Sequence, residues 1–187
     1  AGTGEIRLAS SGIGKLFVSV QTEGLVPPES LKPTDREIKV RRRWLNSEGK
    51  VLRDWHGEKE GSLEVSVGDL VWVEVMLQTR QANLDNIAVV DALPGGFTVE
   101  NPRLATSAVR LSGGEVLAKA ARADRTEFLD DRVVLFASAK PVPRVFRYAI
   151  RAVAGGEFLV PGIQASCMYD ETLSSLDQSD VVKVIVQ

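Results

Sequence analysis

The side chains that most often carry catalysis are scarce in this sequence. His56 is the only histidine and Cys167 the only cysteine among 187 residues. A serine-histidine-aspartate triad would need a nucleophile held by the fold, and no GxSxG elbow occurs. His56 and Cys167 lack the ligand spacing of metal sites, and His56 lies in a polar stretch typical of an exposed loop. We therefore expect no catalytic residue, no bound metal and no cofactor.

The most noticeable acidic pair is Asp130-Asp131, directly before Arg132. Adjacent residues of a strand point to opposite faces, so neighbouring carboxylates are poorly placed to act together as general acid and base. Calcium would need further oxygen ligands at loop spacing, and none is patterned nearby. We expect the pair to cap a turn or to pair with arginine.

A third candidate is the apolar cluster Cys167-Met168-Tyr169, which precedes the acidic, serine-rich segment 170–179. One interpretation is the end of a core strand. The other is an exposed anchor for a neighbouring surface, because methionine and tyrosine are enriched where one surface packs on another. The pattern alone leaves both interpretations open.

The overall composition is that of an ordinary globular domain, with 44% hydrophobic and 26% charged residues. A formal charge of -2 and a pI of about 5.6 give no sign of a nucleic-acid partner. The run Arg41-Arg42-Arg43 lies in an alternating segment, where it is typical of the solvated face of a strand, with a binding patch as the alternative.

Alternation of apolar and polar residues is the main signal for the elements that would position these side chains. It runs through the segments 15–22, 37–45, 69–79 and 144–154. In 69–79 the more apolar face holds Val71, Val73, Val75 and Leu77. In 37–45 the one exception is Arg42, which falls on the apolar side. This period predicts half-buried antiparallel strands, and their spacing predicts a β-sandwich.

Three segments interrupt the strand pattern. Gly155-Gly156 predicts a tight hairpin that joins 144–154 to 157–160. Glu115–Arg122 is rich in helix-forming residues and predicts a short helix between strands. The segment 24–34 holds three prolines and is interpreted as a linker.

Several segments, taken in order, resemble those of bacterial alpha-2-macroglobulins. Val89–Leu104 resembles the family's "VVD-LLPAGFE-ENP-L" run, and Glu127–Phe136 resembles "EFRDDR-VA". The series also includes 67–73, 146–153, 156–161 and 168–170, and it covers about residues 37–187. In that family this order marks the C-terminal macroglobulin-like domain, the counterpart of the receptor-binding domain in animal members.

The resemblance implies an all-β fold, an antiparallel β-sandwich of macroglobulin type with one short helix inserted between strands. Residues 37–187 would form the C-terminal domain, and residues 1–36 the terminal strands of a preceding CUB-like domain plus the proline-rich linker. The parent would be a periplasmic, protease-trapping inhibitor, with anchoring to the inner membrane through its N-terminus as a further option. Its partners would be other domains of the same chain, target proteases and other periplasmic proteins, but not nucleic acid.

The resemblance also bears on Met168 and Tyr169. In members with a Cys–Gln thioester, a Met-Tyr pair of this domain lies against the thioester domain and helps to shield it. Met168 and Tyr169 match that pair, so the resemblance implies an interdomain contact role for them. The thioester pattern C-x-E-Q is absent here, because Cys167 is followed by Met-Tyr-Asp. The chain would thus be a non-catalytic contact or lid module.

The alternative hypothesis is an immunoglobulin-like adhesion or polysaccharide-binding module, which the sandwich pattern alone would also fit. That function predicts an exposed aromatic platform built from Trp44, Trp55 or Trp72.

Overall fold

The computed structural model describes residues 7–9, 11, 13–15, 17–21, 31–54, 63–100, 120–178 and 180–186. Within these ranges the chain forms strands and no helix. The strands are β1 (Thr34–Arg36), β2 (Ile38–Leu45), β3 (Val51–Arg53), β4 (Leu63–Ser66), β5 (Leu70–Thr79), β6 (Leu84–Ala92), β7 (Phe97–Glu100), β8 (Arg125–Phe128), β9 (Arg132–Ala139), β10 (Arg144–Ala152), β11 (Gly156–Val160), β12 (Gln164–Cys167), β13 (Asp170–Leu176) and β14 (Asp180–Ile185). The all-β expectation is therefore confirmed.

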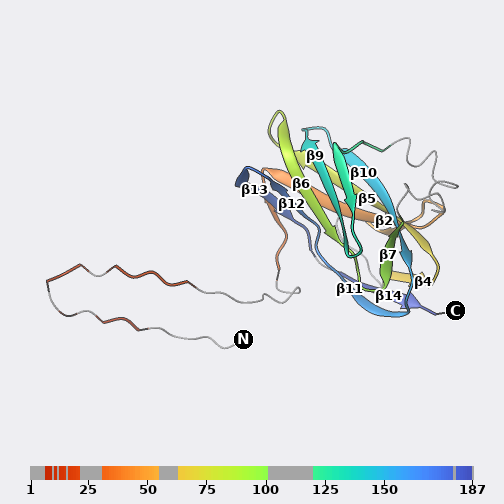
Figure 1. The fold of residues 1–187 in the computed structure, drawn as a ribbon, viewed down its shortest axis with the longest axis horizontal. Coiled ribbons are helices and arrows are strands. Elements are labelled where there is room, and N and C mark those ends of the chain that lie inside the picture. The colour runs from red at the N-terminus through yellow and green to blue at the C-terminus, as the bar shows by residue number, and fades with distance from the viewer. Residues whose placement is uncertain are drawn as a thin grey trace.

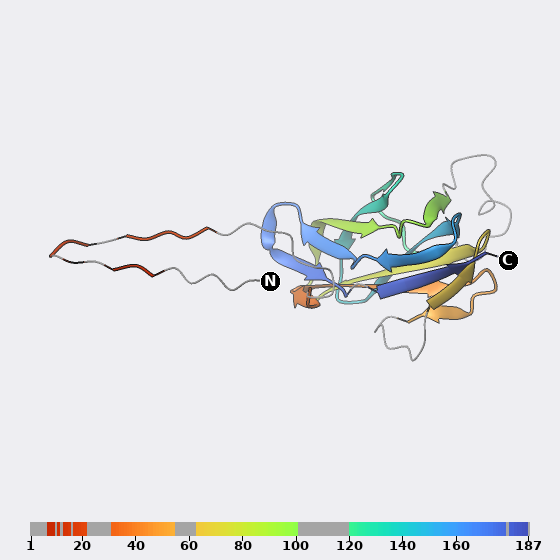
Figure 2. The same ribbon diagram turned by 90° about the horizontal axis from the view of Figure 1, so that it is seen from below.

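The strands form three sheets. A six-stranded sheet has the order β1-β13-β12-β6-β9-β8, and a five-stranded sheet has the order β3-β2-β5-β10-β7. The two lie as layers of a sandwich, as Figures 1 and 2 show from perpendicular directions. A small sheet, β11-β14-β4, adds to one end. Neighbouring strands are antiparallel except for β14 and β4, which pair in parallel.

The core follows directly from the alternation in sequence. In β5 the side chains of Val71, Val73, Val75 and Leu77 are at most 1% exposed, as the pattern predicted. They pack with apolar residues of all three sheets in one continuous cluster. Because burial stabilises by about 25 cal/mol per Å² of apolar surface, this cluster is the main source of stability.

All three arginines of the run in β2 form ion pairs, whereas the side chains of a solvated strand face would mainly contact water. Arg41 binds both carboxylate oxygens of Asp35, at 2.9 and 2.7 Å. Arg42 is buried between the sheets and forms an ion pair with Asp91, and Arg43 pairs with Glu74. The solvated-face interpretation is therefore wrong for Arg42, since its position on the apolar side of the strand is matched by a buried acid from the facing sheet.

The hairpin predicted at Gly155-Gly156 is also wrong. Strand β10 pairs with β5 and β7, whereas β11 pairs with β14 in the small sheet. The backbone N–H groups of Val153 and Ala154 donate to the carbonyl of Gly96, at 2.8 and 3.3 Å. These hydrogen bonds hold residues 153 and 154 against the turn that precedes β7. The chain therefore passes at Gly155-Gly156 from the five-stranded sheet into the small sheet and does not form a hairpin with β10.

The other interruptions are only partly described. The helix expected over 115–122 lies outside the described residues except for 120–122, which are not helical. Residues 34–36, which we assigned to the region before the sandwich, form strand β1 instead, and β1 joins the six-stranded sheet through β13. The described residues between 7 and 21 are not in strands, so the strand predicted over 15–22 is wrong for residues 15 and 17–21. These residues lie beyond one end of the sandwich (Figure 1). The division into residues 1–36 and 37–187 stays a prediction.

Candidate interdomain contact site

Met168 and Tyr169 form the turn between β12 and β13. The exposed fraction is 52% for Met168 and 81% for Tyr169. Cys167, one residue earlier, is buried at the end of β12 and belongs to the core cluster. The cysteine thus ends a core strand, as the first interpretation has it, and the next two side chains face solvent; their role as an anchor for a neighbouring surface stays a prediction.

The turn is held in place from both sides. The backbone N–H of Met168 donates to the carbonyl of Asn86 at 2.9 Å. After the turn, Asp170 Oδ1 accepts hydrogen bonds from the backbone N–H of Thr172 at 3.0 Å and from its hydroxyl at 2.6 Å. These contacts fix the direction in which the exposed pair points.

Asn86 is the positioning residue that sequence reasoning missed. Its φ of 59° is left-handed, and the pairing of β6 with β9 shifts register between Leu84 and Ile87. Such bulges re-aim strand ends, and asparagine tolerates this conformation better than most residues. The available signal was the Asp85-Asn86 dipeptide, which by itself predicts a turn as readily as a bulge.

The tryptophans do not support an exposed platform among the described residues. Trp44 is 1% exposed and Trp72 is 3% exposed. Trp44 packs edge-on against Phe97, with ring centroids 5.5 Å apart. Trp55 and His56 lie outside the described residues. Two of the three tryptophans that the adhesion hypothesis offered for its platform are thus buried.

The acidic pair Asp130-Asp131 is on the surface. Asp131 binds the guanidinium of Arg132 at 2.6 and 2.9 Å, and this hydrogen bond lowers the pKa of the Asp131 carboxyl. The expected pairing with arginine is confirmed. Across the described ranges, no three His, Cys, Asp or Glu side chains come close enough together to hold a metal ion.

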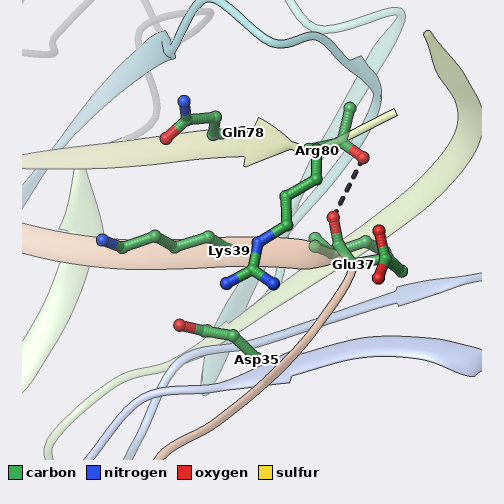
Figure 3. A pocket seen from close by; sticks show the side chains of 7 residues that line it. Asp35, Glu37, Lys39, Gln78 and Arg80 are labelled. Carbon is green, nitrogen blue, oxygen red and sulfur yellow. Dashed lines mark hydrogen bonds between the residues drawn. The ribbon is translucent and has the colours of Figure 1, made fainter. Parts of the chain in front are cut away.

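A polar cleft with a volume of about 240 Å³ opens where β1 passes into β2. Figure 3 shows Lys39 and Gln78 along it, with Arg80 reaching across toward Asp35. Glu37 turns the chain here with a φ of 61°, and its carbonyl accepts from Arg80 N at 3.1 Å and Thr79 Oγ1 at 2.9 Å. The cleft marks the point where the chain leaves one sheet for the other.

The carboxylate in this cleft is an ion-pair partner. Burial raises the pKa of Asp35, but hydrogen bonds from Arg41 and Ser175 outweigh it and hold the pKa below its usual value. Asp35 therefore stays ionised at neutral pH and is unsuited to act as a general acid.

The described segments contain no helix that is long and apolar enough to cross a bilayer.

Known proteins share the sequence pattern and the fold of this chain. The model of the bacterial alpha-2-macroglobulin MG10 domain matches residues 38–171. The chain belongs to this family. The resemblance seen in the sequence and the macroglobulin type of the sandwich are both confirmed.

Curated relatives place this MG10 domain within much longer proteins. The alpha-2-macroglobulin of Escherichia coli (strain K12) is 31% identical over 176 residues, covering 88% of this chain and 10% of that protein. The alpha-2-macroglobulin of Pasteurella multocida (strain Pm70) is 26% identical over 143 residues, covering 76% of this chain and 7% of that protein. The chain thus spans a tenth or less of the length of these relatives.

Solved structures agree on the fold. Native E. coli alpha-2-macroglobulin from domain MG7 to the C-terminus superposes with a TM-score of 0.69 at 27% identity, covering 84% of this chain and 25% of that one. E. coli alpha-2-macroglobulin activated by porcine elastase gives a TM-score of 0.71 at 25% identity, covering 84% of this chain and 14% of that one.

Proposed function

We propose that this MG10 domain is a non-catalytic contact or lid module of a larger bacterial alpha-2-macroglobulin, and that Met168 and Tyr169 carry the contact. The observation that supports this most is the exposed pair itself, an apolar and an aromatic side chain held out on a fixed turn. Large amphipathic side chains of this kind are enriched where surfaces pack together.

The larger protein would act as a protease-trapping inhibitor in the periplasm. The relative solved after activation by porcine elastase supports an encounter between this kind of protein and a protease. Its partners would be target proteases, other domains of the same chain and further periplasmic proteins, without a cofactor. Cell fractionation tests the location, because recovery of the parent from the cytoplasm would contradict it.

Protease capture by the full-length parent tests the function. The parent should slow the hydrolysis of a protein substrate by elastase, and this 187-residue chain alone should leave it unchanged. Tyr169→Ala in the parent should change the extent of capture several-fold, because it removes the aromatic contact.

Tyr169→Phe is the matched control, since it keeps the ring and should behave nearly like the parent. Capture that is the same with Tyr169→Ala as with the parent would remove the contact role from this residue. Inhibition by the isolated chain would contradict the view that it is only a contact module.

A further inference from the structure

A second exposed apolar turn lies between β9 and β10. Val142 is 75% exposed and stands between Pro141 and Pro143. Turns that only reverse the chain are usually built from glycine, asparagine or aspartate, which serve the backbone without presenting apolar surface. Here two prolines hold a valine outward.

This turn is fixed to the neighbouring strand. The side chain of Gln78 donates to the carbonyl of Pro141 at 2.7 Å, and Thr79 N donates to the carbonyl of Lys140 at 3.0 Å. Proline also restricts the backbone, so little freedom remains to be lost when a partner binds. The turn is thus a pre-formed apolar projection.

The register of β6 places the β9–β10 turn and the turn of Met168 and Tyr169 at the same end of the six-stranded sheet. Strands β9 and β12 are the two neighbours of β6. Ala139, at the end of β9, pairs with Leu84, and Met168 binds Asn86 only two residues further along β6. Since neighbouring strands are about 4.8 Å apart, the ends of β9 and β12 lie about 10 Å apart on either side of β6, and both turns leave this end of the six-stranded sheet.

A contact between two domains buries more surface than Met168 and Tyr169 alone can offer. A large aromatic side chain buries about 150–250 Å². Contacts between domains of one chain bury about 600–1,500 Å². A partner that covers Met168 and Tyr169 must therefore extend over neighbouring surface, and the β9–β10 turn is placed to supply it.

Polar groups border this apolar surface. Gln78, which holds Pro141, also lines the cleft that contains Lys39 and Arg80 (Figure 3). An apolar centre with a charged margin is the usual composition of a protein contact. In both views of the fold, the described residues before β1 lie beyond the end of the sandwich that carries β12 and β13.

We propose that Val142, Met168 and Tyr169 form one docking surface, and that a neighbouring domain of the same parent chain covers all three. The occupant is part of the same chain because this domain spans only 10% of the matched E. coli protein, so most of such a parent lies outside it. This inference rests on the proposed function, which it extends from one turn to two.

Hydroxyl-radical footprinting of the full-length parent, read by mass spectrometry, tests the surface. The urea-unfolded parent is the reference for full exposure. In the native parent the oxidation rates of Val142, Met168 and Tyr169 should all be at least about five-fold below that reference, although the isolated sandwich exposes all three. Val142→Asp should then raise the oxidation of Tyr169 several-fold, because an unpaired charge buried in the apolar contact opens it.

Val153→Asp is the matched control, since Val153 is a 51% exposed valine at the other end of β10. Val153→Asp should leave the oxidation of Tyr169 unchanged. If Val142→Asp fails to fold, Val142→Ala replaces it and should raise the oxidation of Tyr169 by less than the several-fold increase expected for Val142→Asp. Protection of Met168 and Tyr169 without protection of Val142, or without a response to its substitution, would overturn this inference and leave the proposed function standing. Full exposure of Tyr169 in the native parent would overturn both.

Discussion

Three polar side chains meet in the core between the two large sheets. Arg42 of β2 forms an ion pair with Asp91 of β6, and the hydroxyl of Tyr148 donates to Asp91 Oδ2 at 2.5 Å. Arg42 also donates to the carbonyl of Pro161 at 2.6 Å and lies over the ring of Trp44. A buried ion pair adds little net stability, but removing one partner is costly because the other charge remains buried.

Tyr148→Phe tests this centre at the scale of one atom. The substitution removes a donor to a carboxylate that is 1% exposed, so the free energy of unfolding should fall by about 1–3 kcal/mol at pH 7. Urea unfolding of wild type and variant measures the difference. A variant as stable as wild type would mean that Asp91 does not need this bond.

The same pair carries a pH dependence with a definite sign. Burial, together with the charge of Asp91, raises the pKa of Tyr148 well above its usual value of 10.0. The neutral hydroxyl therefore stabilises the fold fully below pH 10, and this contribution is lost as the pH rises above 10, where the unfolded chain ionises first. The stability gap between wild type and Tyr148→Phe should narrow above pH 10.

Sequence reasoning reached only half of this centre. Arg42 could be recognised as an exception because it broke the alternation of its strand. Asp91 gave no such signal, since it lies in a segment where we identified no alternation. The two residues are 49 positions apart and in different sheets, so nothing local connects them.

At the scale of elements, glycines at two places make room for one ring. The turn Gly95-Gly96 and Gly156 all pack against Phe158 of β11. A Cβ on Gly96 would lie 2.7 Å from Cδ2 and 2.8 Å from Cζ of that ring, whereas a Cβ on Gly95 would lie 3.4 Å away. This packing attaches the small sheet to the turn before β7.

Gly96→Ala should therefore destabilise the domain, and Gly95→Ala should not. The first forces the Phe158 ring to move against Gly156, at a cost of about 1–3 kcal/mol for overpacking. The second changes a neighbouring, exposed glycine and should stay within about 0.5 kcal/mol. Thermal unfolding of both variants measures the difference. Equal effects would show that the turn backbone, and not the ring, is what matters.

The long alternating strands were predictable, and their partners were not. Alternation identified β2, β5 and β10 because each buries one face against the core. The same glycines that signalled a turn after β10 were assigned to the wrong kind of turn, because a local pattern does not contain the strand with which β11 pairs. The exposed pair Met168-Tyr169 was singled out, but Asn86, which holds it, was not.

At the scale of the whole molecule, the three sheets share one core. The main cluster contains Leu135, Val73 and Val182, one from each sheet. Ion pairs add links: Arg42–Asp91 joins the two large sheets, and Arg53–Asp180, at 2.8 Å, joins the five-stranded sheet to the small one. No sheet has a separate core of comparable size among the described residues.

The domain should consequently unfold in one step. Urea curves followed by tryptophan fluorescence and by far-UV circular dichroism should coincide, because the fluorescence includes the buried Trp44 and the dichroism follows all strands. Asp180→Ala should lower the single midpoint without separating the curves, since it removes the acid that forms an ion pair with the buried Arg53. Two distinct transitions would mean that the small sheet unfolds independently.

The arginine run of β2 has a consequence for how the chain finds its fold. Its three consecutive guanidiniums bind acids on three different strands: Asp35 of β1, Asp91 of β6 and Glu74 of β5. A slip of β2 by one residue would turn each arginine to the opposite face, burying two charges and removing all three acids from reach. A sandwich with β2 in the wrong register is therefore less stable. Although its partners are distant in sequence, β2 has a single favourable register.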